Sequence, residues 1–385
     1  MQSANNSVIL TLCKKITVAV YLSGYAKIMK REQLIALIAC SVIFVTVLII
    51  AVATATRSSS SDREKRPVQT ATVTANESNV PSTNVLPETP VVIEQSQPEP
   101  PPQFNRYKRN SSNHISYGNF DRSSTGKLSK NLALYQFKAG ILVDLDTRKV
   151  IWEKNSNSPV PIASLTKLLT IYTAFEELER RTELTLQTQA TVSIECTQVG
   201  KVKVNLVPGE KVSLHELFIY SMLRSANDAA HLIAEYFGYG DSSTFINLMN
   251  RKAADIGMTG ACFYNANGLP IYGKTPAETR MNLASCQDMV KLIERLYEYP
   301  MILRYASCRS KATRHGMLTN GNRLLGSVKG MEGLKTGYTN AAGHCLAFSC
   351  RRNGRRLAGV VTGFSKRQNC FDFTAKLLDW GFRRP

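Results

Sequence analysis

The sequence has no metal-binding or nucleophile-elbow signature. Its nine cysteines include no C-x-x-C pair, and no Cys/His cluster has the spacing of a zinc finger. His215-Glu216 lacks the second histidine of a zinc-protease helix, since position 219 is isoleucine. No G-x-S-x-G occurs, which argues against hydrolases with a serine on a nucleophile elbow. We therefore expect no metal site. We expect the cysteines to be small buried apolar residues, and one or more disulfides remain possible if the C-terminal part is exported.

Acidic residues are few: 29 Asp and Glu stand against 48 Lys and Arg, a formal charge of +19. No nucleic-acid-binding motif accompanies this charge, so nucleic acid is not an expected partner. A formal phosphate-loop match at 268–275 follows NAN rather than a buried strand, and Pro270 removes a backbone amide, so nucleotide binding is not expected either. Glycine and proline are close to average usage and 43% of residues are apolar, which excludes collagen-like and wholly disordered chains.

One long hydrophobic run is present, at residues 34–55. It holds 22 residues without a charge, and as a helix it would span about 33 Å, enough for a bilayer core of about 30 Å. Basic residues lie on both sides, so the positive-inside rule favours neither orientation strongly. The segment from Met29 looks like the basic start of a signal sequence, which would make residues 1–28 an upstream extension. We expect an uncleaved membrane anchor, preceded by a cytoplasmic segment at 1–33.

Residues 56–130 have the composition of a solvated tether. They are rich in Ser, Thr, Asn and Pro, with eight prolines between Pro67 and Pro102. About seventy flexible residues span roughly 45–50 Å, longer if the proline tract is stiff. The tether could therefore hold a domain well away from a membrane.

Residues 131–385 are patterned like one globular domain. Apolar β-rich runs at 137–146 and 149–154 predict a hairpin, and a second hairpin is predicted at 344–364 around Asn353-Gly354. A further strand is expected at 331–337. Between them the period is helical, with helices expected at 164–181, 213–223 (capped by Ser213 and Glu216), 227–237, 242–256, 284–297 and 368–380. Strand blocks at both ends around a helical insert imply an α/β (α+β) fold, with one antiparallel sheet completed from both ends of the domain.

Three short motifs in the globular part carry the chemistry. In SLTK, Ser164 and Lys167 are three residues apart, which makes them neighbours on one face of a helix. A serine hydroxyl needs a base, and a lysine becomes one when burial or a second cation lowers its pKa. Lys335 of KTG could be that cation. A serine at a helix start also offers its backbone N–H to an oxyanion.

Each motif is weak alone, because S-x-x-K also occurs at Ser124 and S-x-N at Ser3. Taken singly, Ser164 would be a helix N-cap, Asn227 another cap and Lys335 a surface lysine. All three motifs occur in this order at expected element boundaries of the globular part. The combination favours a catalytic interpretation.

With these motifs the sequence resembles the low-molecular-mass penicillin-binding serine D-Ala-D-Ala carboxypeptidases, peptidase family S11. The resemblance covers about 132–385 and includes LDTRKVIWEKN before the serine, NGLP at 267–270, NRLLG at 322–326 and KLLDWGF at 376–382. It implies the penicillin-binding protein/β-lactamase-like transpeptidase fold. It also implies peptidoglycan stem peptides ending in D-Ala-D-Ala as substrates, β-lactams as covalent inhibitors, and no metal or organic cofactor. A single-pass protein of the bacterial cytoplasmic membrane is implied, with its catalytic domain on the extracytoplasmic side.

The resemblance also implies roles for residues that match the motifs. Ser164 would be acylated by the penultimate D-Ala, with Lys167 as its base. Ser225 would relay protons, and Asn227 would orient the substrate amide and Lys167. The KTG strand would bind substrate through four residues: Lys335 and Thr336 at the terminal carboxylate, then Gly337, and Tyr338, whose amide completes the oxyanion hole with that of Ser164.

Two departures from the family pattern are apparent. No second β-rich domain or amphipathic C-terminal helix follows the catalytic part, so residues 34–55 are expected to provide the anchoring. An arginine that often binds the carboxylate is replaced by Cys370, and Arg367 could substitute for it.

Two alternatives to a carboxypeptidase are kept. One is a D,D-endopeptidase acting on cross-linked stem peptides, which uses the same motifs. The other is an inactive, membrane-tethered wall-binding module, which would need no nucleophile. A β-lactamase is not favoured: Glu278 and Asn282 match E-x-x-x-N, but this pattern is common by chance and its distance to the KTG motif differs from that in β-lactamases.

Overall fold

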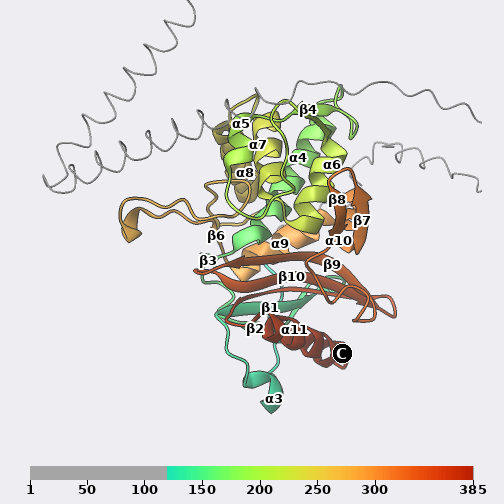
Figure 1. Cartoon of the computed structure of the whole chain (residues 1–385). Coiled ribbons are helices and arrows are strands. Elements are labelled where there is room, and N and C mark those ends of the chain that lie inside the picture. The colour runs from blue at the N-terminus through green and yellow to red at the C-terminus, as the bar shows by residue number, and fades with distance from the viewer. Residues whose placement is uncertain (1–118, 385) are drawn as a thin grey trace, which may run out of the picture. The chain divides into compact units, whose positions relative to one another are not determined.

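The computed structural model describes residues 119–384 (Figure 1). The hydrophobic run at 34–55 and the expected tether up to residue 118 lie outside the described residues. Within 119–384, none of the helices is long and apolar enough to cross a membrane.

A five-stranded antiparallel sheet forms the centre of the fold, in the order β2-β1-β11-β10-β9. Its strands are β1 (Ala139–Asp144), β2 (Lys149–Lys154), β9 (Met331–Thr339), β10 (Gly343–Arg352) and β11 (Arg355–Phe364). Both expected hairpins and the expected strand near 331 are confirmed. The turn between β10 and β11 has positive φ at Asn353 and Gly354, which Asn-Gly adopts readily. Because Ile141 of β1 pairs with Val360 of β11, the sheet is completed from both ends, as the sequence predicts.

The helical region lies between the two strand blocks in the sequence. Its longer helices are α4 (Thr166–Arg180), α6 (Leu214–Ile219), α7 (Asn227–Phe237), α8 (Ser242–Asp255), α9 (Cys286–Leu296) and α10 (Pro300–Ser307). The capping box of Ser213 and Glu216 is present at the start of α6. The expected helix at 213–223 is divided, since α6 continues as a π-helical segment, η2 (Tyr220–Arg224). Helix α10 was missed by the sequence analysis.

Shorter elements lie before and between these helices, and the sequence analysis did not predict them as separate elements. They are α3 (Lys130–Ala133), β3 (Val160–Pro161), η1 (Ala163–Leu165), β4 (Gln189–Thr191), α5 (Ile194–Gln198), β5 (Lys211–Ser213), η3 (Pro276–Glu278), β6 (Leu283–Ala284), β7 (Ser310–Thr313) and β8 (Gly316–Thr319). Each is too short to produce a clear period in the sequence.

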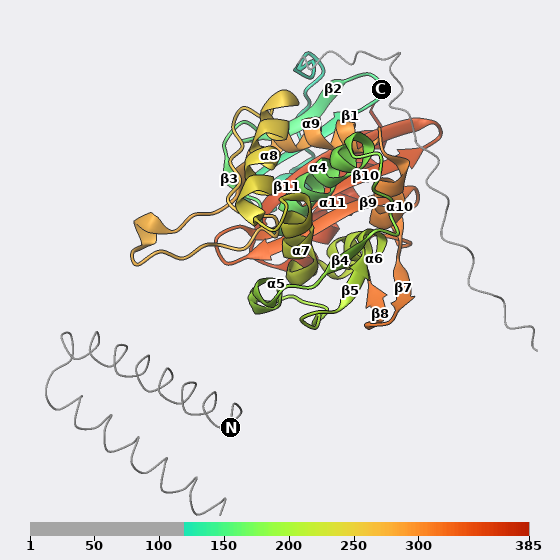
Figure 2. The same ribbon diagram turned by 90° about the horizontal axis from the view of Figure 1, so that it is seen from above.

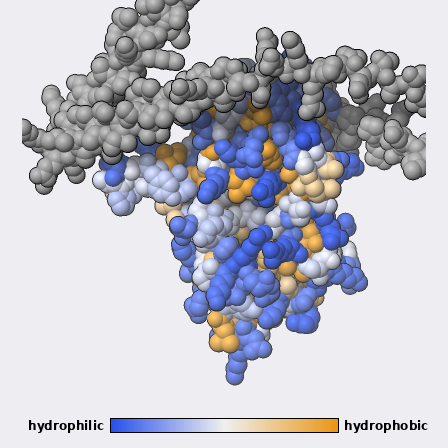
Figure 3. All heavy atoms as spheres, viewed as in Figure 1, coloured by the Kyte–Doolittle hydropathy of each residue, from blue (hydrophilic) through white to orange (hydrophobic). Residues whose placement is uncertain are grey.

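The two faces of the sheet are covered by different helices. In Figure 1 the helical region lies on one side of the sheet, and α11 (Arg367–Phe382) lies on the other. Alternation along β1 serves both faces: Ile141 belongs to the core on the helical side, and Leu142 belongs to the core under α11. On the face shown in Figure 3, apolar residues occur in small groups between hydrophilic ones. Apolar burial in the two cores therefore holds the layers together.

Helix α4 passes through the centre of the helical region. All of its residues from Thr166 to Phe175 are buried, which is more than the single apolar stripe expected from the sequence. A helix buried on every side is held in one position by its neighbours. The residues at the start of α4 are correspondingly fixed.

The packed part of the chain begins before residue 131, where the sequence analysis placed the start of the catalytic domain. Phe120 is 3% exposed and belongs to the main core, and Asp121 forms a β-bridge with Lys149. Burial of one aromatic side chain in an otherwise polar segment is sufficient to fix this stretch, and composition alone does not reveal it.

A long arm at 269–281 projects from the domain and is visible in both ribbon views (Figures 1 and 2). A single bridge joins Ile271 to Arg280, and every residue from 271 to 278 is exposed. The formal phosphate-loop match falls largely within this arm. No buried strand precedes it, and only the three-residue 3-10 helix η3 follows it, in place of the α-helix that a phosphate loop requires.

The seven cysteines of residues 119–384 are all free thiols. Five of them are buried, which agrees with their expected use as small apolar residues.

Candidate active site

Ser164 lies in η1, a tight turn directly before α4. The preceding Ala163 has φ +48°, an uncommon value for a residue with a side chain. Gly268 packs against this turn with φ +87°, and a Cβ added there would lie 2.1 Å from the Ala163 carbonyl oxygen. Only glycine fits at position 268. The purely structural interpretation of Ser164 as a helix N-cap is wrong. The N-cap position of α4 is Leu165, and no side chain caps this helix.

Lys167 points to Ser164 from the first turn of α4. Its Nζ lies 3.1 Å from Ser164 Oγ, 2.8 Å from Asn227 Oδ1 and 2.6 Å from the Asn267 carbonyl oxygen. The residue is fully buried. When the amine is neutral, two of these groups accept its hydrogens and its lone pair is available to the Ser164 hydroxyl.

Burial lowers the pKa of Lys167 well below its usual value, and the positive charge of Lys335 lowers it further. The carboxylate of Asp228 opposes this by favouring the charged form. The first two causes dominate because the amine has no access to water. Lys167 therefore has the character of a base.

Lys335 is also buried, at 2% exposure, so the alternative of a surface lysine is wrong. It belongs to β9, and its Nζ donates to the Thr336 carbonyl oxygen at 3.1 Å. Burial lowers the pKa of Lys335 to about 7. A substrate anion near this amine would favour its charged form, whereas in the free protein near neutral pH it is held between the two states.

Strand β9 runs directly against the turn that carries the serine. A Cβ added to Gly337 would lie 3.1 Å from both the Ser164 backbone nitrogen and the Ile162 carbonyl oxygen. A side chain at this position would require the strand or the turn to shift by a few tenths of an ångström, so glycine lets β9 pack closely on the turn of Ser164. The next residue, Tyr338, is 55% exposed and stacks on His344 with ring centroids 4.4 Å apart.

The third motif lies between η2 and α7. Ser225 has φ +62° and ends η2, and Asn227 is the first residue of α7. The Asn227 amide group donates to the carbonyl oxygens of Gly200 (3.2 Å) and Lys201, while its oxygen accepts from Lys167. The side chain therefore connects the loop at 200–202 to the buried lysine and does not cap a helix.

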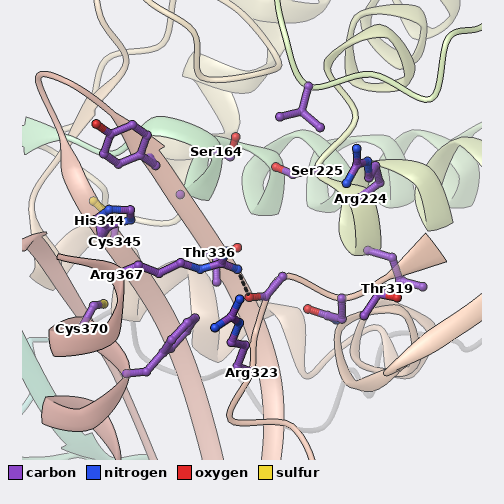
Figure 4. Close-up of a pocket in the computed structure, with 17 residues that line it drawn as sticks. Ser164, Arg224, Ser225, Thr319, Arg323, Thr336, His344, Cys345, Arg367 and Cys370 are labelled. Carbon is purple, nitrogen blue, oxygen red and sulfur yellow. Dashed lines mark hydrogen bonds between the residues drawn. The ribbon is translucent and has the colours of Figure 1, made fainter.

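A cleft of about 550 Å³ opens over these groups (Figure 4). Five of the expected site residues line it: Ser164, Ser225, Thr336, Gly337 and Tyr338. The other three, Lys167, Asn227 and Lys335, are buried in its walls. All eight expected residues thus belong to one place, although they come from segments far apart in the sequence.

Cys370 and Arg367 both line the same cleft, one turn apart on α11. Burial raises the pKa of the Cys370 thiol, which keeps it neutral. Arg367 donates to the Gly321 carbonyl oxygen at 2.8 Å, and a Cβ on Gly321 would lie 2.7 Å from Thr336 Oγ1. The guanidinium is therefore close to the threonine of KTG, as Figure 4 shows.

Several supporting residues were missed by the sequence analysis. The Asn267 carbonyl oxygen accepts hydrogen bonds from Lys167 Nζ and, at 3.5 Å, from the Ser164 hydroxyl. Asn267 is the first residue of the NGLP segment, to which the sequence analysis gave no role. Asp228 accepts from the backbone amides of Val204 and Leu206, which fixes the loop beside Asn227. No local pattern marks a backbone carbonyl or a loop-binding carboxylate, so only the tertiary structure identifies them.

The residues of the β-lactamase alternative do not form a catalytic pair. Glu278 is exposed on the projecting arm, where it accepts from the Lys274 amide at 2.9 Å, and it does not line the cleft. Asn282 is buried and donates to Thr166 Oγ1 at 3.0 Å, so it supports the start of α4. Within residues 119–384 there is also no cluster of three or more His, Cys, Asp or Glu that could hold a metal ion.

Comparison with known proteins gives consistent results. The family model described as D-alanyl-D-alanine carboxypeptidase, peptidase S11, matches residues 129–366. D-alanyl-D-alanine carboxypeptidase DacF of Bacillus subtilis is 30% identical over 262 residues, which cover 67% of this chain and 64% of that protein. A D-alanyl-D-alanine endopeptidase of Escherichia coli is 28% identical, with 63% of this chain and 76% of that protein covered.

Solved structures show the same architecture. Penicillin-binding protein D2 of Listeria monocytogenes, in its ampicillin-bound form, superposes with a TM-score of 0.59 and 26% identity. The match covers 67% of this chain and all of that chain. By contrast, the chain spans less than two thirds of the length of DacF.

Proposed function

The chain belongs to the peptidase S11 family of D-alanyl-D-alanine carboxypeptidases, and on that premise we propose that it removes the terminal D-Ala from peptidoglycan stem peptides. Its fold is the penicillin-binding protein fold expected from the sequence. One observation carries the proposal: the nucleophile candidate Ser164 lies 3.1 Å from the amine of a fully buried lysine, Lys167. Such a pair activates a serine without a histidine or a metal.

In the proposed acylation step, neutral Lys167 takes the proton of the Ser164 hydroxyl as Oγ bonds to the carbonyl carbon of the penultimate D-Ala. The backbone N–H groups of Ser164 and Tyr338 stabilise the oxyanion. As the C–N bond breaks, the proton that Lys167 took passes through Ser225 to the leaving amine, which returns Lys167 to its neutral form. The terminal D-Ala departs, and an ester joins the peptide to Ser164.

Deacylation uses the same groups in reverse order. Water attacks the ester carbonyl, Lys167 takes a proton from that water, and Ser164 Oγ leaves with a proton returned by the lysine. The products are the shortened peptide and free enzyme. Asn227 holds Lys167 in position through its 2.8 Å hydrogen bond in both steps.

The terminal carboxylate of the substrate is assigned to the β9 side of the cleft. Lys335 and Thr336 bind it, and Arg367 supplies the guanidinium that the family usually places at Cys370. This assignment is supported by the proximity of Arg367 to Gly321 and Thr336. Gly337 lines the cleft between Thr336 and Tyr338, where the strand packs closely on the turn of Ser164.

A labelled penicillin tests the nucleophile directly. The full chain should become covalently labelled, and Ser164→Ala should abolish labelling while Ser225→Ala still labels, more slowly. The same preparation should release D-Ala from a pentapeptide stem. If neither labelling nor release occurs in folded protein, the alternative of an inactive wall-binding module is favoured.

An endopeptidase acting on cross-linked stem peptides is a second candidate. It is supported by the volume of the cleft, about 550 Å³, since a single leaving D-Ala fills a small part of it. Two of the similar curated proteins are named endopeptidases. Incubation with a pentapeptide stem and with a cross-linked dimer separates the two activities by their products.

The proposed location is the extracytoplasmic side of the bacterial cytoplasmic membrane. Residues 34–55 would form a single-pass anchor after a cytoplasmic segment at 1–33, and a tether from residue 56 would lead to the catalytic domain. Alkaline carbonate extraction of membranes tests the anchor. Release of the full-length protein into the soluble fraction would contradict it.

A further inference from the structure

The cleft is strongly cationic and has no acidic residue in its lining. Three arginines line it: Arg224, Arg323 and Arg367. Neither Arg224 nor Arg323 forms an ion pair or side-chain hydrogen bond with any described residue, and both are exposed. Like charges held together without a counter-charge repel one another, so this cleft favours an anionic occupant.

Arg323 and Arg367 can both bind the terminal carboxylate of the proposed substrate. Figure 4 shows Arg323 and Arg367 on the same side of the cleft, and burial together with the charge of Arg323 lowers the pKa of Arg367. They lie next to Thr336, on the side assigned to the terminal carboxylate of the substrate. Arg224 is separate from this pair: Figure 4 shows it beside Ser225, across the cleft from Arg323 and Arg367.

Arg224 also lies beside the strand that leads to the Arg323 and Arg367 side of the cleft. It is the last residue of η2, which packs beside β8. Thr319 ends β8 and begins the segment 319–323, which carries the Arg367 contact at Gly321 and continues to Arg323. The whole segment except residue 322 lines the cleft. This segment thus runs from the neighbourhood of Arg224 to the Arg367 side, and it is the path along which a leaving residue bound at Arg367 could reach Arg224.

We propose that Arg224 is a specificity-determining residue that binds a second carboxylate on the leaving group, whether an acidic side chain or a further carboxylate of a larger peptide. This proposal rests on the proposed function. The contact would be a charge-assisted hydrogen bond in a partly open cleft, so we expect an effect of about threefold to tenfold. It concerns a part of the substrate that does not react, and it should therefore act mainly on KM.

Three peptides that differ only in the leaving residue test the proposal: acyl-D-Ala-D-Ala, acyl-D-Ala-D-Gln and acyl-D-Ala-D-Glu. All three give the same acyl-enzyme, so their differences in kcat/KM report on binding and acylation alone. The full chain should cleave the D-Glu peptide about threefold to tenfold better than the isosteric D-Gln peptide. Higher ionic strength should reduce this ratio.

Arg224→Gln should bring the D-Glu to D-Gln ratio close to one. Arg251→Gln is the matched control, since Arg251 is exposed on α8, outside the cleft lining, and loses the same charge. Labelled penicillin counts the active molecules in each preparation. Equal rates for the D-Glu and D-Gln peptides in the unmodified chain, or a ratio that survives Arg224→Gln, would overturn the role of Arg224. Failure to cleave any of the three peptides would instead overturn the proposed function.

Discussion

Lys167 Nζ lies 2.8 Å from Asn227 Oδ1, which joins the first turn of α4 to the first residue of α7, 60 positions later. The same asparagine donates to the carbonyl oxygens of Gly200 and Lys201. One amide thus fixes both the base and the loop at the edge of the cleft. The Asn227 oxygen contacts the base and its NH2 group contacts the loop, so different substitutions at Asn227 can change one contact without the other.

Asn227→Asp tests the electrostatic part of this arrangement. A carboxylate beside Lys167 would favour the charged amine and raise its pKa, so the acid limb of the acylation rate should move to higher pH. Rates of penicillin labelling between about pH 5 and 10 measure the shift. Asn227→Ala removes the hydrogen bonds without adding charge, and it should slow acylation without moving the limb upward. An identical pH profile for both variants would contradict this account.

In the unmodified protein, the acylation rate should depend on pH through the protonation of Lys167. Lys167 must be neutral to act as a base, so its lowered pKa places the acid limb below the usual titration range of lysine. Acylation should fall as pH decreases. A rate independent of pH from about 5 to 9 would count against a lysine base.

Stability should rise with pH because of the buried lysines. Burial lowers the pKa of Lys335 to about 7, so the unfolded chain binds more protons than the folded chain between about pH 7 and 10. Each such amine adds a slope of up to about 1.4 kcal/mol per pH unit to the free energy of unfolding. Lys335→Met should remove one contribution.

Urea unfolding at several pH values measures this slope. Fluorescence of Trp152 and Trp380 follows the described part within the full chain, since these are its only two tryptophans. Lys329→Met, at an exposed lysine, is the control and should leave the slope unchanged. A slope unaffected by Lys335→Met would show that Lys335 is protonated in the folded state.

Gly268→Ala should disrupt the turn that holds Ser164. An added Cβ would lie 2.1 Å from the Ala163 carbonyl oxygen, so the turn or the Asn267 carbonyl must move. Displacement by about 1 Å can cost about a hundredfold in rate, and we expect a loss of that order in penicillin acylation.

Gly209→Ala is the matched control for this substitution. Gly209 has a similar φ of +82°, but a Cβ there meets nothing within 4 Å. Both variants should lose about 1–2 kcal/mol from backbone strain, and only Gly268→Ala should lose acylation. Equal acylation by the two variants would contradict the proposed constraint on Ser164.

Arg367→Gln should raise the KM for a D-Ala-D-Ala peptide by about threefold to tenfold, because it removes a guanidinium that lies beside Gly321 and Thr336. Lys366→Gln removes a neighbouring charge outside the cleft lining and serves as the control. Cys370→Arg in the Arg367→Gln background should restore the lower KM if the carboxylate site is shared. No change in KM on losing Arg367 would assign the carboxylate to other groups.

The sequence determined the sheet and most of the helices. The apolar β-rich runs that became β1 and β2, the Asn-Gly turn at 353–354 and the capping box at Ser213 are local signals whose physical basis lies within a few residues. Elements with weak local signals, such as α10 and the β7–β8 hairpin, were missed because contacts with distant segments stabilise them. The burial of Phe120 was missed for the same reason, because it depends on contacts with core residues that are distant in the sequence.

The sequence by itself also determined which residues could do the chemistry, since the types and spacings of Ser164, Lys167, Asn227 and Lys335 limit their reactions. Only the tertiary structure decided their state. A lysine is a base or a charged surface group according to its access to water, and burial against a second amine is a property of the packed chain. The same holds for Arg224, whose counter-charge or lack of one depends on segments that meet only in the fold.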